Sequence, residues 1–257
     1  MNRIDEVFSK KKKGVLNIYF TAGYPKIDDT LRIARALEAA GVDLIEIGIP
    51  YSDPIADGPT IQDSSQKALD AGMSLKLLMK QLQDLRKYVK IPVILMGYIN
   101  PVLQYGFTKF CQDCKGVGID GVILPDLPMQ EYVEMYQQTF EEHGIYNIFL
   151  MTPQTSEKRV FQINEASKGF IYMVSSASIT GAKQEVSQAQ IDYFERIQKM
   201  NLSVQRLIGF GISNKETFDN ACQYASGAII GSAFINQLNK DDSDEAITSF
   251  VGSIINP

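Results

Sequence analysis

The chain is 257 residues long and carries 25 Lys and Arg against 30 Asp and Glu, a net charge of −5. Hydrophobic residues make up 45% of it, which excludes a disordered chain, and the mild acidity argues against a general nucleic-acid binder. No stretch approaches the roughly 20 apolar residues of a membrane span, the N-terminus lacks the apolar region of a signal peptide, and the cysteines number only three, so we expect a cytoplasmic protein.

Short apolar runs of strand length alternate along the chain with segments of helical periodicity. The predicted strands are 17–21, 44–49, 93–98, 122–125, 147–151, 170–175, 205–210 and 227–230. The predicted helices are 31–40, 75–89, 107–114, 129–142, 157–166, 188–199, 215–224 and 244–255, with an extra helix at 2–11 before the first strand. This alternation predicts parallel strands with helical crossovers, and about 250 residues suit a single (β/α)8 TIM barrel. We expect residues 1–257 to form that one domain, with long loops at 50–62 and 178–190.

The second predicted strand carries an acidic residue, Glu46, in the run EIGIPYSDPIADGP. Side chains alternate along a strand, so the isoleucines around Glu46 face the helices and Glu46 faces the barrel interior. Burial raises the pKa of such a carboxyl group and suits it to general acid–base catalysis near neutral pH. The structural alternative is an interior ion pair, but only Arg206 supplies a basic residue within the predicted strands.

A second acidic residue, Asp57, follows in a turn rich in proline and glycine. Asp before Gly is ordinary turn chemistry, and Asp53 before Pro54 is equally ambiguous. The tight turns nonetheless allow this loop to fold over the barrel mouth and place Asp57 above Glu46.

Glycine turns end the last three predicted strands, at Thr180-Gly181, Gly209-Phe210-Gly211 and Gly231-Ser232. The last turn opens a short helix near Ala233. Barrel enzymes often bind phosphate with loops of this kind, because glycine lets backbone N–H groups approach an anion and a helix N-terminus favours negative charge. Each turn alone is a weak signal, but together they predict a phosphate site.

Other motifs favour structural roles. Cys111 and Cys114 share the apolar stripe of a helix and have no second Cys/His pair to complete a metal site, so we expect core packing and no bound metal. The single histidine, His143, precedes Gly144 at a predicted helix end, where a cation is favourable. The basic run 10–13 is interpreted as a solvated helix end.

Taken together, these motifs resemble those of a known family, the tryptophan synthase alpha chains. The long motif at Glu46–Pro59 carries most of the resemblance, and further matching segments extend it over nearly the whole chain. Those segments are Tyr19–Pro25, Leu95–Pro101, Leu124–Pro128, Thr180–Ala182, Gly209–Ser213 and Gly231–Ala233. The chain departs from many relatives at Ser178 and Ile179, and it has Tyr19 and Tyr51 where many have Phe.

The resemblance implies a lyase that cleaves indole-3-glycerol phosphate into indole and glyceraldehyde 3-phosphate without a metal or organic cofactor. By that resemblance Glu46 protonates C3 of the indole ring and later helps deprotonate the glycerol hydroxyl, while Asp57 accepts a hydrogen bond from the indole N–H. The implied phosphate-binding residues are Gly181, Gly211, Gly231 and Ser232, and the implied indole pocket consists of Tyr19, Leu95, Tyr98, Ile123 and Tyr172.

The resemblance also implies a partner, a tryptophan synthase beta chain in an α2β2 complex, with the loop at 50–62 facing it and the loop at 178–190 as a lid. Two other functions stay open at this stage. One is a barrel isomerase acting on another sugar phosphate, and the other is a non-catalytic allosteric partner of a beta chain. We expect neither nucleic acid nor a membrane as a partner.

Overall fold

A computed structural model describes residues 1–175, 187–209 and 211–255. The strands are β1 (Val15–Thr21), β2 (Leu44–Gly48), β3 (Val93–Met96), β4 (Gly121–Ile123), β5 (Tyr146–Asn147), β6 (Leu150–Met151), β7 (Phe170–Val174), β8 (Gln205–Gly209) and β9 (Gly227–Ile230). The first helices are α1 (Arg3–Lys10), α2 (Thr30–Ala40), α3 (Pro59–Asp70), α4 (Leu75–Gln81), the 3-10 turn η1 (Leu82–Asp84), α5 (Leu85–Tyr88), α6 (Ile99–Tyr105) and α7 (Phe107–Val117). The remaining helices are α8 (Met129–Glu131), the π-helical turn η2 (Tyr132–Tyr136), α9 (Gln137–His143), α10 (Glu157–Ala166), α11 (Gln188–Lys199), α12 (Lys215–Tyr224), α13 (Ser232–Lys240) and α14 (Asp244–Ile255).

The parallel strands form one sheet in the order β5-β4-β3-β2-β1-β9-β8-β7-β6. Its two edges, β5 and β6, are the two ends of a single predicted strand, separated only by Ile148 and Phe149. The N–H of Ile148 donates to the carbonyl oxygen of Val122 at 2.9 Å, and the N–H of Tyr172 donates to the carbonyl oxygen of Phe149 at 2.9 Å. This segment therefore bonds to β4 on one side and β7 on the other, which closes the sheet into the predicted barrel.

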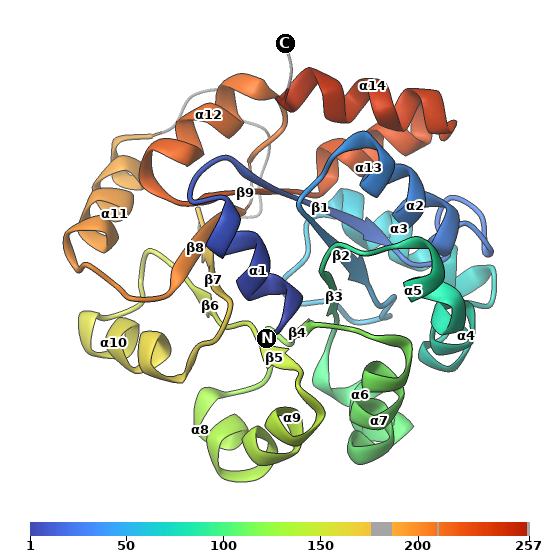
Figure 1. The fold of residues 1–257 in the computed structure, drawn as a ribbon, viewed down its shortest axis with the longest axis horizontal. Helices are drawn as coiled ribbons and strands as arrows, with labels where there is room; N and C mark the ends of the chain where they lie inside the picture. The colour runs from blue at the N-terminus through green and yellow to red at the C-terminus, as the bar shows by residue number, and fades with distance from the viewer. Residues whose placement is uncertain (176–186, 210, 256–257) are drawn as a thin grey trace.

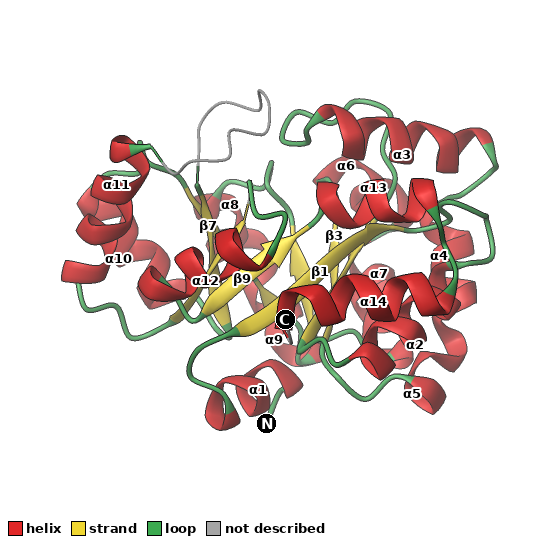
Figure 2. Ribbon diagram, turned by 90° about the horizontal axis from the view of Figure 1, so that it is seen from above, coloured by secondary structure: helices red, strands yellow, loops and turns green. Residues whose placement is uncertain are grey.

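Helices surround the sheet, and α1 lies across one end of the barrel (Figure 1). The side chain of Asn2 caps α1 by accepting from the N–H of Ile4, and its Nδ2 donates to the carbonyl oxygens of Asp120 and Gly144. Those acceptors precede β4 and β5, so α1 covers the end of the barrel where the strands begin. Figure 2 shows α1 and α3 at opposite ends of the sheet.

Most predicted helices are confirmed, but two regions were assigned wrongly. The predicted loop 50–62 ends at Gly58, because Pro59 begins α3 as its first residue, a position where the missing proline N–H costs nothing. The helix α6 was not predicted: its first three residues belong to the matched segment Leu95–Pro101, and the rest received no assignment. Within the described ranges no helix is long and apolar enough to cross a membrane.

Candidate active site

Glu46 lies on β2, next to Tyr19 of β1 in the strand register, and only 1% of it is exposed. Its carboxylate accepts a hydrogen bond from Nδ2 of Asn17 at 3.0 Å. It also interacts electrostatically with Tyr172 of β7, a strand that is not a neighbour of β2 in the sheet. Glu46 therefore points into the barrel interior, as predicted.

The environment of Glu46 raises the pKa of its carboxyl group to near neutral pH. The pKa of Glu46 is raised to about 8 in all. Burial is the largest cause of the rise, the hydrogen bond from Asn17 opposes it, and the nearby charge of Asp57 adds to it. In the described part of the chain no Lys or Arg forms an ion pair with Glu46. The predicted structural alternative, an interior ion pair, is therefore not found.

Asp57 lies in the loop between β2 and α3 and is fixed by Tyr98. The hydroxyl of Tyr98 donates to Oδ2 of Asp57 at 2.8 Å and accepts the backbone N–H of Ala56 at 3.0 Å. Burial raises the pKa of Asp57, and the hydrogen bond from Tyr98 opposes that rise. The loop is thus folded over the barrel mouth, with its carboxyl group close enough to raise the pKa of Glu46.

Two tyrosines with buried rings form walls of the interior around these carboxyl groups. A Cβ on Gly48 would lie 2.0 Å from the hydroxyl oxygen of Tyr19, and a Cβ on Gly209 would lie 2.2 Å from that of Tyr172. Each ring therefore occupies the space that a side chain on its glycine would need. Burial raises the pKa of both phenols well above the ordinary value, so both stay protonated.

The strand register separates the two predicted aliphatic pocket residues. Ile123 pairs with Met96, which pairs with Gly48, so Ile123 and Met96 lie on the interior face with Glu46. The assignment of Leu95 to the pocket was wrong, because Leu95 pairs with Ile47 and shares its helix-facing side. Met96 takes the interior position that was predicted for Leu95.

The described glycines of the last two turns, Gly211 and Gly231, follow the carboxyl ends of β8 and β9, as the phosphate prediction requires. Gly231 follows β9 and is the N-cap of α13, which begins at Ser232. A Cβ on Gly231 would lie 3.4 Å from Cδ1 of Tyr19, so α13 begins beside Tyr19, and the first N–H groups of a helix have no partner within it. Gly211 has φ +78°, a conformation that favours glycine, and a Cβ there would meet nothing within 4 Å. Gly181, the remaining predicted phosphate residue, lies outside the described residues, as do Phe210 and most of the predicted loop 178–190.

The residues predicted to be structural lie away from this interior. Cys111 and Cys114 are buried in α7, and His143 ends α9 with Nδ1 2.7 Å from the carbonyl oxygen of Thr139. Among the described residues no cluster of three Cys, His, Asp or Glu is placed to hold a metal ion. These positions agree with the predicted packing and capping roles.

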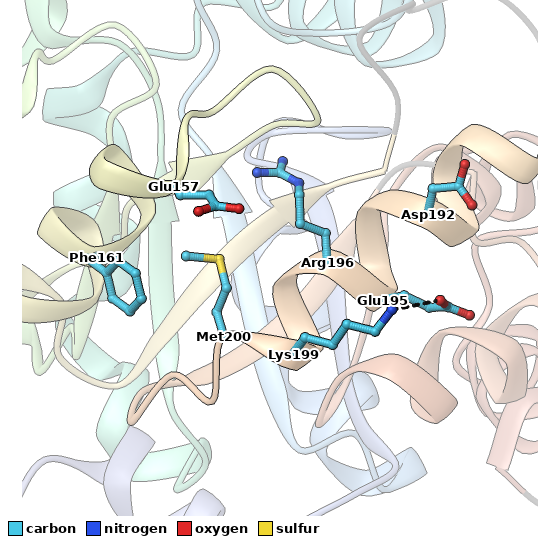
Figure 3. A pocket seen from close by; sticks show the side chains of 7 residues that line it. All are labelled: Glu157, Phe161, Asp192, Glu195, Arg196, Lys199 and Met200. Atoms are coloured by element: carbon cyan, nitrogen blue, oxygen red, sulfur yellow. Dashed lines mark hydrogen bonds and ion pairs between the residues drawn. The ribbon is translucent and has the colours of Figure 1, made fainter.

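A hollow of about 630 Å³ opens between α10 and α11 on the outside of the barrel (Figure 3). It is lined by Glu157, Phe161, Asp192, Glu195, Arg196, Lys199 and Met200. Arg196 donates to the carbonyl oxygens of Pro153 and Thr155, which fixes it in the wall. None of the predicted site residues that the structure describes lines this hollow, so it is separate from the carboxyl pair.

Two interior residues were missed in the sequence, Asn17 and Met96. Asn17 is fully buried on the same strand face as Tyr19, two residues away. The alternation that placed Glu46 could have placed Asn17 as well, but a lone asparagine in an apolar run gave no chemical signal. Met96 would have followed from the register of β2 and β3, which the sequence does not specify.

Comparison with known proteins gives concordant results. A family model described as tryptophan synthase alpha chain matches residues 6–251. The tryptophan synthase alpha chain of Flavobacterium psychrophilum is 55% identical over 254 residues, which cover 99% of this chain and 100% of that one. That of Bacteroides fragilis is 51% identical over 256 residues, which cover 100% of this chain and 97% of that one. A crystal structure of tryptophan synthase subunit alpha from Legionella pneumophila superposes with a TM-score of 0.87 at 35% identity, covering 99% of this chain and 97% of that one. A second crystal structure is that of tryptophan synthase from M. tuberculosis in its aminoacrylate-bound form. Its matching chain superposes with a TM-score of 0.86 at 30% identity, covering 99% of this chain and 98% of that one.

Proposed function

Because the chain belongs to the tryptophan synthase alpha chain family, we propose that its interior carboxyl groups, Glu46 and Asp57, perform the chemistry of that subunit. The chain is a carbon–carbon lyase that cleaves indole-3-glycerol phosphate into indole and glyceraldehyde 3-phosphate. It acts in tryptophan biosynthesis as the alpha subunit and pairs with a beta chain. The observation that carries the assignment of residues is the meeting of two carboxyl groups in different environments at the carboxyl ends of the strands.

Glu46 begins the reaction as a general acid, and burial keeps it protonated up to about pH 8. It gives its proton to C3 of the indole ring, which leaves a positive charge spread toward the ring nitrogen. Asp57, bound to Tyr98, accepts the indole N–H and stabilises this charge. Glu46 then removes the proton of the glycerol hydroxyl next to the scissile bond. The electrons of the broken C–C bond return to the ring, so indole and an aldehyde leave and Glu46 regains its proton.

The substrate would extend from this pair to the glycine turns on the same rim. Tyr19, Tyr98, Ile123 and Tyr172 supply walls for the flat indole ring, and Met96 joins them on the interior face. Backbone N–H groups at Gly211, Gly231 and Ser232 would hold the phosphate with the N-terminus of α13 behind them. Gly181 completes this set on the ground of the resemblance alone.

We further propose that residues 1–257 act as one catalytic domain and that the chain works in the cytoplasm. The closed barrel supports the first proposal, since the segment between β4 and β7 bonds to both strands. The sparse, free cysteines Cys111, Cys114 and Cys222 support the second, because a reducing compartment keeps thiols unpaired.

A turnover assay with two substrates tests this function. The purified chain, mixed with its beta chain, should release indole from indole-3-glycerol phosphate and should leave phosphoribosyl anthranilate unchanged. Asp57→Asn should lower the rate of indole release, because the amide cannot balance the positive charge on the ring. Turnover of phosphoribosyl anthranilate instead would favour the barrel isomerase, and no indole from the parent complex would favour a non-catalytic partner.

A further inference from the structure

We propose that Asn17 is a positioning residue for the lyase reaction, which holds Oε2 of Glu46 through its side-chain amide and keeps Glu46 able to exchange its proton with the substrate. This inference rests on the proposed catalytic role of Glu46. It concerns a residue that touches neither substrate nor reacting atoms in the scheme above, and it acts through Glu46.

The first observation is the geometry of the contact. Asn17 lies on β1 and Glu46 on β2, with Asn17 opposite Leu44 and Tyr19 opposite Glu46 in the register. Nδ2 of Asn17 reaches diagonally across the strand pair to Oε2 at 3.0 Å, and both side chains are buried. Two neighbouring strands fix the two Cα atoms, so this hydrogen bond restricts the carboxylate more than a contact from a loop would. It engages one carboxylate oxygen and leaves the other for proton transfer.

The second observation is that Asn17 gains little else from being an asparagine. Its amide oxygen, Oδ1, is buried and has no hydrogen-bond partner among the described residues. A buried polar atom without a partner costs free energy, and a leucine of similar size would avoid that cost. The orientation that gives Glu46 a donor is thus kept although it leaves the oxygen unpaired, which points to a role in the function of Glu46 and not in the stability of β1.

The third observation is that the other groups facing Glu46 make its charged form harder to reach. Asp57 from the loop raises the pKa of Glu46 by its negative charge, as does burial. Tyr19 from β1 and Tyr172 from β7 stay neutral, and the neighbour on β3, Ile94, is apolar. Asn17 opposes these effects, because a donor to the carboxylate favours the ionised form. Without it Glu46 would hold its proton too tightly and would be a poorer acid toward C3.

The test compares Asn17→Leu with the parent in the complex with the beta chain, by measuring indole release against pH. Since Glu46 starts as an acid, the rate falls above its pKa. We expect Asn17→Leu to move that fall to higher pH by about one unit, the size of one hydrogen bond to a charged group, and to lower kcat about tenfold with KM nearly unchanged. Asn147→Leu is the matched control, because Asn147 is also a buried strand asparagine whose Oδ1 has no partner in the described part of the chain, and it pairs with Val122 on the helix-facing side. It should leave the pH profile and kcat at the parental values.

A second variant keeps the proposal testable if Asn17→Leu does not fold. Asn17→Asp has the same shape but places a second carboxyl group beside Glu46, so the fall in rate should again move to higher pH. An unmoved pH profile in a folded Asn17 variant, with thermal stability as the only change, would overturn the proposal. Glu46→Gln, measured beside them, separates the two levels: a parental rate in that variant refutes the catalytic assignment of Glu46, whereas its loss of rate together with an unmoved Asn17→Leu profile refutes the role of Asn17 alone.

Discussion

The burial of Glu46 predicts that the folded chain loses stability as pH rises, and that removing this carboxyl group makes the protein more stable. The pKa of Glu46 rises from the ordinary value of 4.5 to about 8 in the folded chain. Between these values the folded state keeps the proton and the unfolded state releases it, so the free energy of unfolding falls as pH rises through this window and levels off above about 8. In Glu46→Gln residue 46 has no proton to release, so it makes no contribution to this fall in the free energy of unfolding.

The size of the effect follows from the same shift. One pKa unit corresponds to about 1.4 kcal/mol, so between pH 5 and pH 8 the stability gain of Glu46→Gln over the parent should grow by about 4 kcal/mol. Comparing each variant with the parent at the same pH cancels the titration of all other groups. A more stable Glu46→Gln chain would mean that the acid kept for catalysis makes the parent fold less stable, which is a trade-off between activity and stability.

Equilibrium urea unfolding of the parent and Glu46→Gln at pH 5, 6, 7 and 8 measures this difference. Parallel stability curves for the parent and Glu46→Gln would contradict this prediction, because they would mean that Glu46 titrates alike in the folded and unfolded chains.

Two further predictions concern packing and a buried ion pair. Gly48→Ala should lower the free energy of unfolding by about 1–3 kcal/mol and reduce indole release, because its Cβ would lie 2.0 Å from the hydroxyl oxygen of Tyr19. Thermal unfolding measures this loss, and Gly116→Ala is the control because its Cβ would meet nothing within 4 Å. Asp120→Ala should cost about 3–5 kcal/mol in urea unfolding, because it leaves the largely buried guanidinium of Arg86 without the carboxylate 2.6 Å away. A cost below about 1 kcal/mol would show that the backbone carbonyl oxygens to which Arg86 already donates are sufficient partners.

The fold could be predicted from the alternation of apolar runs and helical stripes, because each strand–helix unit repeats a pattern that only a parallel sheet buries on both faces. The break between β5 and β6 could not be predicted, since it lies where the segment's hydrogen bonds pass from β4 at Ile148 to β7 at Phe149 and follows no change in composition. The helix α3 was assigned partly to a loop, because the prolines and glycines before it mark turns and the same signal hides a helix that begins at Pro59.

The site could be predicted where it depends on alternation within one strand and could not where it depends on neighbouring strands. Glu46 follows from the isoleucines on both sides of it, whereas the interior place of Met96 and the helix-facing place of Leu95 follow from the register between β2 and β3. The position of Asp57 depends on the hydroxyl of Tyr98, which lies 41 residues along the chain. No local pattern reports such a contact.

In the proposed lyase reaction the buried carboxyl group of Glu46 moves the proton. The most direct test of this role is indole release from indole-3-glycerol phosphate by folded Glu46→Gln saturated with beta chain, measured against the parent at the same pH. We expect a fall of at least about 100-fold, the smaller estimate for a positioned acid–base group. Release at the parental rate would contradict it, since glutamine keeps the shape of the side chain and lacks only the exchangeable acid.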